Sequence, residues 1–253
     1  MGAEDPAGPL LVEHGSDGVL ALTLNRPEKR NALSIELREA LAAELGRLDP
    51  GEAGAVVITG AGSAFCAGMD VTQFGGDRNN RERLLESSLA CMRSVGECPV
   101  PVLAAVNGPA LAGGFVLALA ADVRIAEPAA TFGFPELPRG IPPSFAWARA
   151  ALPAALATEL CISGRVIDAE SARADGVVSE LAAVGRAATR AREVAAEISS
   201  RPRGAITETK RRILLQRERL YGFLFEDEER MFRTTLLGDG GGSQAAGPAS
   251  DHG

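Results

Sequence analysis

The chain has 253 residues, of which 46% are hydrophobic, and its formal net charge is −7 with only two histidines. This length allows one large core, and an acidic chain lacks the basic face that nucleic acids require, so nucleic acid is excluded as a partner. Because His14 is near the N-terminus and His252 lies in a Gly/Ser/Ala-rich tail, we expect neither a Ser-His-Asp triad nor a metal site.

The first part of the chain predicts alternating strands and helices. Leucines at helical spacing predict a helix from Leu33 to Leu48, with Arg38 among the polar residues off the apolar stripe. Composition and periodicity also indicate a loose segment over 1–9, strands over 10–13, 19–24 and 55–59, and a helix over 81–96.

Residues 102–121 (VLAAVNGPALAGGFVLALAA) are the most informative stretch. They predict a buried strand, a turn at Asn-Gly-Pro, and a helix that is apolar on every face and opens on Gly113 and Gly114. Small residues at this junction would let a ligand approach the N–H groups that lack partners at a helix start, although a simple packing joint gives the same pattern. Pro and Gly interrupt the uncharged run, so no membrane span is expected.

The second part predicts further short elements and a long helical end. Glu136 is a lone carboxylate near Phe132, Phe134 and Leu137. The expected elements are strands over 122–126, 131–134 and 177–181, helices over 144–151, 154–163, 169–174, 186–199 and 204–236 (broken near 221–222), and a disordered tail over 238–253.

Short motifs and the cysteines bear on nucleotide cofactors and on the cellular compartment. Residues 60–70 follow a strand and resemble the start of a dinucleotide fingerprint, but Phe65 stands where its third glycine belongs, and no P-loop is present. The four cysteines lie in or beside apolar runs without a CxxC pair, which indicates free thiols in a reducing compartment. We therefore expect no nucleotide cofactor and a cytoplasmic location.

Four segments, in this order, resemble the enoyl-CoA hydratase/isomerase (crotonase) family: 25–33 (NRP…NAL), 63–70 (SAFCAGMD), 107–114 (NGPALAGG) and 134–143 (FPE…GIPP). A fifth segment, 163–178, resembles the one that follows in the family. The resemblance implies an α/β fold built as a spiral of ββα units over 10–195. It implies a helical C-terminal region (196–237) that forms a homotrimer or a dimer of trimers, and an acyl-CoA thioester as ligand without a separate cofactor.

The resemblance also implies a site. The backbone N–H groups of Met69 and Gly113 would bind the thioester oxygen, and Glu136 would be the acid/base. Such backbone donors suit an enolate, whose negative charge appears only during the reaction. The substrate and CoA would be bound by residues matched to the family motifs: Lys29, Arg30, Ala32, Ala67, Met69, Asp70, Gly113 and Gly114.

Two departures from the family pattern bear on the reaction. Hydratases of the family carry two glutamates, and the first falls on Val116 here, which favours a 1,3-proton shift by Glu136 over the addition of water. The remaining interpretations are a 2-enoyl-CoA hydratase, an acyl-CoA thioester hydrolase, and a non-catalytic acyl-CoA-binding subunit. The Phe- and Lys-rich segment with which many relatives end is replaced by the Gly-rich run after Leu237.

Overall fold

The computed structural model describes residues 8–238, and the two predictions for the termini (1–9 loose, 238–253 disordered) lie almost entirely outside this range. The strands are β1 (Leu10–His14), β2 (Val19–Leu24), β3 (Ala55–Gly60), β4 (Val102–Val106), β5 (Ala110–Leu111), β6 (Val123–Ala126), β7 (Thr131–Gly133), β8 (Val166–Asp168) and β9 (Glu180–Leu181). The α-helices are α1 (Ile35–Gly46), α2 (Arg78–Gly96), α3 (Gly113–Ala120), α4 (Phe145–Ala151), α5 (Ala154–Ser163), α6 (Ala169–Ala174), α7 (Ala187–Ser199) and α8 (Arg203–Leu237). Three short 3₁₀ helices are η1 (Pro27–Lys29), η2 (Val71–Gln73) and η3 (Leu137–Arg139).

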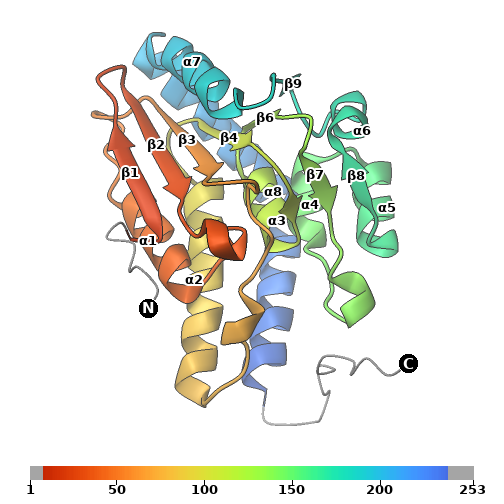
Figure 1. Cartoon of the computed structure of the whole chain (residues 1–253). Coiled ribbons are helices and arrows are strands. Elements are labelled where there is room, and N and C mark those ends of the chain that lie inside the picture. The colour runs from red at the N-terminus through yellow and green to blue at the C-terminus, as the bar shows by residue number, and fades with distance from the viewer. Residues whose placement is uncertain (1–7, 239–253) are drawn as a thin grey trace, which may run out of the picture.

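The main sheet has six strands in the order β1-β2-β3-β4-β6-β9, and only the β1–β2 hairpin is antiparallel (Figure 1). Successive side chains of a strand point to opposite faces of a sheet, so each strand serves two cores. Along β3, Val56 and Ile58 face the larger core with α1, α2 and α3, while Ala55 and Val57 face a smaller core against α7. The sheet is therefore covered on both faces, as expected for a parallel sheet.

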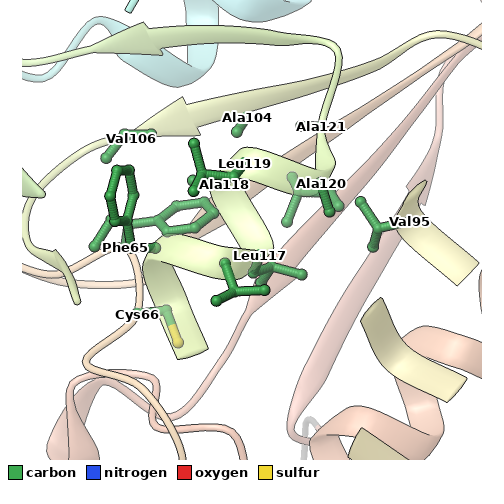
Figure 2. Close-up of a cluster of buried hydrophobic side chains, with 14 of the residues drawn as sticks. Phe65, Cys66, Val95, Ala104, Val106, Leu117, Ala118, Leu119, Ala120 and Ala121 are labelled. Atoms are coloured by element: carbon green, nitrogen blue, oxygen red, sulfur yellow. The ribbon is translucent and has the colours of Figure 1, made fainter. Parts of the chain in front are cut away.

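Helix α3 lies inside the larger core. Leu117, Ala118, Leu119 and Ala120 are at most 1% exposed, and Figure 2 shows them packed with Phe65 and with strand β4. An eight-residue helix with no polar side chain could not face water on any side. The prediction of a strand followed by a core helix that opens on two glycines is confirmed.

A second, smaller layer of extended backbone carries the candidate site. Strands β5, β7 and β8 form a three-stranded sheet, and isolated bridges pair Leu33 with Met69 and Cys66 with Ala110. The segments that follow β2, β3 and β4 thus pass through this second layer before α1, α2 and α3 begin. The sequence did not predict β5 or β8, because two or three residues are too few to show a period.

Helix α8 runs unbroken from Arg203 to Leu237, so the predicted break near Tyr221-Gly222 is wrong. A glycine in a helix interior costs only about 1 kcal/mol relative to alanine. That cost is offset by contacts with α4, because Trp147 packs on Phe225 with ring centroids 4.8 Å apart, and Arg149 donates a hydrogen bond to the hydroxyl of Tyr221.

The strand predicted over 177–181 is shorter than expected. Only Glu180–Leu181 pairs with β6, while Val177 and Val178 are buried and the carbonyl of Val177 accepts a 2.6 Å hydrogen bond from Nε of Arg124. At Val177 the backbone carbonyl therefore bonds to the buried side chain of Arg124 and not to a neighbouring strand.

Between residues 8 and 238, no helix has both the length and the apolar character needed to cross a bilayer.

Candidate active site

The backbone of Met69 is fixed from both sides. Leu33 donates its N–H to the carbonyl of Gly68 at 2.8 Å, and Asp70 donates its N–H to the carbonyl of Leu33 at 3.2 Å. In such a parallel bridge the central residue turns its own N–H away from the neighbouring strand. Accordingly, within residues 8–238 the N–H of Met69 has no hydrogen-bond acceptor.

The N–H of Gly113 is free for a different reason. Gly113 is the first residue of α3, and the first N–H groups of a helix have no intrahelical partner. The neighbouring Ala112 donates its N–H to the carbonyl of Gly133 at 2.9 Å, which joins the start of α3 to β7. No acceptor for the N–H of Gly113 is found among the described residues either.

The two free N–H groups lie side by side. A Cβ placed on Gly113 would be 3.6 Å from the Met69 nitrogen, and a Cβ on Gly68 would be 3.6 Å from the Gly113 nitrogen. Glycine is required next to this pair, because a Cβ on Gly114 would overlap the carbonyl of Cys66. The close approach explains why no side chain larger than a methyl occurs at this junction.

Ala112, directly before Gly113, has a backbone conformation that alanine rarely adopts. Its φ is 51° and its ψ is −125°, a region populated mainly by glycine. Strained residues of this kind cost about 1–3 kcal/mol and persist only where the surrounding structure holds them. The φ and ψ angles of Ala112 turn the chain from β5 into α3 and set the direction of the Gly113 N–H.

Glu136 lies three residues after the end of β7 and is half-buried at the start of η3. Burial raises the pKa of Glu136 to about 7, and its Oε2 is buried without a hydrogen-bond partner among the described residues. Phe134 lies two residues before it, fully buried, with its ring centroid 5.1 Å from that of Phe115 in α3.

The position where the family pattern has the first of its two glutamates is apolar. Val116 lies one turn into α3 and is 6% exposed, packed in the larger core. Its N–H donates to the carbonyl of Ala112 at 3.0 Å, so the backbone there is ordinary helix. No proton can be transferred by the side chain at this position.

The residues matched to CoA binding lie around the same junction. The carbonyl of Arg30 accepts a 3.0 Å hydrogen bond from the Ala67 N–H. Asp70 forms an ion pair with Arg26 at 2.8 Å, and the guanidinium of Arg26 also donates a hydrogen bond to the carbonyl of Ala32. The structure thus brings together six of the eight, namely Ala32, Ala67, Met69, Asp70, Gly113 and Gly114, with Arg30 at the edge. Lys29 is exposed at the end of η1.

Three residues near this site were missed or misplaced by the sequence analysis. Asn31 is fully buried with φ 55°, and its amide donates to the carbonyls of Ala61 and Ala64. Arg26 holds Asp70, and its place in the Asn-Arg-Pro motif was the available signal. Arg38 was expected on the polar side of its helix but is fully buried, which the spacing of the leucines could not reveal. Within the described range, no group of His, Cys, Asp and Glu side chains could hold a metal ion.

Comparison with known proteins agrees with this geometry. The family model for enoyl-CoA hydratase/isomerase matches residues 14–238. A protein of Thermus thermophilus named as an enoyl-CoA hydratase is 38% identical over 207 residues, covering 78% of this chain and 80% of its own. The crystal structure of an enoyl-CoA hydratase/isomerase from Xanthobacter autotrophicus is 30% identical with a TM-score of 0.79, covering 94% and 89% of the two chains.

The crystal structure of enoyl-CoA hydratase from Bacillus anthracis, also 30% identical, superposes with a TM-score of 0.77 over 88% of this chain and 90% of that one. The α/β architecture with a helical C-terminal region is that of the crotonase structures. The range of the family model, residues 14–238, includes the second layer and most of the main sheet. The chain belongs to the enoyl-CoA hydratase/isomerase family.

Proposed function

We propose that the protein converts 3-enoyl-CoA thioesters into 2-enoyl-CoA thioesters. The carboxylate of Glu136 takes a proton from C2, and the electron pair of that C–H bond moves onto the thioester oxygen as an enolate. The N–H groups of Met69 and Gly113 bind this oxygen. As the thioester C=O bond re-forms, the C1=C2 pair of the enolate becomes the double bond between C2 and C3. The pair of the former C3=C4 bond takes the proton from the protonated Glu136 at C4.

The observation that carries this proposal is the single carboxylate with a pKa near neutrality. An acid/base is most effective when its pKa is close to the working pH, and burial raises the pKa of Glu136 to about 7. One group that exchanges one proton is sufficient for an isomerisation. Addition of water is easier with two carboxylates to position and activate the water, and Val116 cannot serve as the second.

A product analysis in H₂¹⁸O tests the proposal. With a 3-enoyl-CoA substrate we expect a product of unchanged mass with its double bond at C2, and loss of this activity in Glu136→Gln. Incorporation of ¹⁸O into a 3-hydroxyacyl-CoA would instead establish hydration. Release of free CoA would establish thioester hydrolysis, and tight CoA-ester binding without any product would establish a non-catalytic binding subunit.

Hydration of 2-enoyl-CoA is the second candidate, because the relatives are named enoyl-CoA hydratases. In that reaction Glu136 alone would activate the water and protonate C2. The same experiment with a 2-enoyl-CoA substrate separates the two candidates, since only a hydratase would add solvent oxygen to it.

We also propose that the protein forms a homotrimer through its C-terminal helix. Helix α8 exposes large apolar side chains, of which Phe223 is 72% exposed and Leu215 is 58% exposed. Exposed apolar side chains on one helix are typical of a protein interface. A monomeric mass by light scattering would contradict this proposal.

A cytoplasmic location remains a prediction that rests on the expectation of free thiols in a reducing compartment.

A further inference from the structure

Arg38 is the largest fully buried side chain among those described, and it forms no ion pair there, although the charges of Glu36, Glu39 and Asp70 favour its cationic form. Its guanidinium lies between α1 and α2, where Nη1 donates to Oγ of Ser88 at 2.8 Å and contacts Sδ of Met69 at 3.2 Å. Within residues 8–238 no carboxylate forms an ion pair with it. Burial lowers the pKa of Arg38 to about 10, which still leaves it cationic near neutral pH.

The unpaired atoms of Arg38 have a defined geometry. Nε and Nη2 are buried without hydrogen-bond partners in the described part of the chain. These two nitrogens form one edge of the guanidinium, with parallel N–H bonds that match the two oxygens of a carboxylate. A buried cation with a free bidentate edge is costly to maintain unless something binds there.

Arg38 is adjacent to the pair of free amides. The thioether of Met69, which Nη1 contacts, has its Sδ 3.5 Å and its Cγ 3.3 Å from the position of a Cβ on Gly113. The Met69 side chain therefore lies between Nη1 of Arg38 and Gly113, beside the place where the thioester oxygen would bind. Methionine is unbranched and flexible, so it can move aside for a ligand more easily than any other apolar side chain of its size.

We propose that the acyl group of the substrate ends in a carboxylate, which binds the Nε/Nη2 edge of Arg38 while the thioester oxygen binds the amides of Met69 and Gly113. The substrate class would be CoA monothioesters of dicarboxylic acids. This inference rests on the proposed function, because it assumes that an acyl-CoA occupies the site.

Binding of unreactive ligands tests the inference independently of turnover. Saturated acyl-CoA esters are prepared in pairs of equal chain length, one ending in a methyl group and one in a carboxylate, and their Kd values are measured by calorimetry. For the best-fitting length we expect the carboxylate ester to bind about 10²-fold more tightly to the wild-type protein, as typical for a buried charge pair. In Arg38→Met this preference should disappear, and in Arg38→Lys, which lacks the bidentate edge, it should be reduced.

Arg83→Met is the matched control, because Arg83 is an exposed arginine on α2 that pairs with Glu39. It should keep the wild-type preference. If Arg38→Met does not fold, the comparison of paired ligands on the wild-type protein still decides. Equal affinity for both members of every pair overturns the inference and leaves the proposed function intact, whereas no binding of any acyl-CoA overturns both. Loss of the preference in Arg83→Met would also overturn it, because bulk charge would then be the cause.

Discussion

The backbone nitrogen of Met69 lies 3.6 Å from the position that a Cβ on Gly113 would occupy, although the two residues are far apart in the sequence. Met69 is held by its bridge to Leu33, and Gly113 is held by the strained turn at Ala112. Both elements leave one N–H without an acceptor in the described chain. The pair is thus formed before any ligand binds, which is how a preorganised oxyanion site lowers a reaction barrier.

Gly113→Ala should strongly reduce activity without unfolding the protein. The added methyl would stand 3.3 Å from Cγ of Met69 and 3.6 Å from its nitrogen, in the space where the oxyanion would bind. Gly113 is not at a positive φ, and alanine favours a helix start more than glycine does. We expect kcat to fall about 10²–10³-fold, with an unchanged or higher Tm. Gly46→Ala, where a Cβ meets no atom within 4 Å, is the control and should keep full activity.

The rate should depend on pH through Glu136. Burial raises the pKa of Glu136 to about 7, and proton abstraction from C2 requires the deprotonated form. We therefore expect kcat/KM to rise with pH up to about 7 and then to level off. The measurement is kcat/KM of the wild type between pH 5 and 8, with any coupling enzyme in excess. A profile that is flat over this range would show that another group is the base.

The same carboxyl makes stability depend on pH. The pKa of Glu136 is about 7 in the folded protein and about 4.5 when exposed, so the folded state binds more protons between these values. Its contribution to stability is fully present below pH 4.5 and is lost as the pH rises through 7. Glu136→Gln cannot ionise, so we expect urea unfolding to show the variant gaining stability relative to wild type from pH 5 to pH 8. A difference that does not change with pH would contradict the assigned pKa.

Local patterns in the sequence predicted much of the fold, and long-range contacts account for what they missed. The strand over Val102–Val106 and the core helix after it were predicted because apolar residues and turn residues alternate clearly there. The continuity of α8 depends on contacts with α4, such as Trp147 with Phe225, which no local pattern encodes.

The candidate site divides in the same way. Gly113 could be identified because the helix start and its small residues are contiguous, and Met69 only through the family resemblance. Arg38 could not be identified, because a charged residue on an amphipathic helix normally faces water. The buried guanidinium of Arg38 contacts Ser88 and Met69, which lie on other segments of the chain, so no local pattern could reveal its burial.

Ala112→Gly should stabilise the protein, which is unusual for an alanine-to-glycine change. Glycine relieves the cost of φ 51° and ψ −125°, and this gain exceeds the entropy that glycine adds to the unfolded chain. We expect a gain of about 1 kcal/mol in the free energy of unfolding. Ala155→Gly, at an exposed position in α5, should lose about 1 kcal/mol because its backbone is ordinary helix. Equal losses in both variants would mean that Ala112 is not strained.

The anchor of α8 to the main sheet should be among the most sensitive points for stability. Lys210 is 2% exposed, and its Nζ lies 2.5 Å from Oδ2 of Asp122, which also accepts the N–H of Val102 at 2.8 Å. Lys210→Met would leave the Asp122 carboxylate, which is 13% exposed, without its close counter-charge, and among the described residues its remaining ion-pair partner is Arg217 at 4.0 Å. Removal of one partner of a buried pair typically costs about 3–5 kcal/mol, which urea unfolding would measure.

The double variant Lys210→Met/Asp122→Asn distinguishes the charge from the packing of the lysine chain. Because asparagine needs no counter-charge and can still accept the Val102 N–H, the double variant should recover most of the loss. Arg211→Met, which breaks a surface pair with Glu208, should cause no measurable change. If the double variant is as unstable as Lys210→Met alone, the aliphatic part of Lys210 and not its charge would hold α8 against β4.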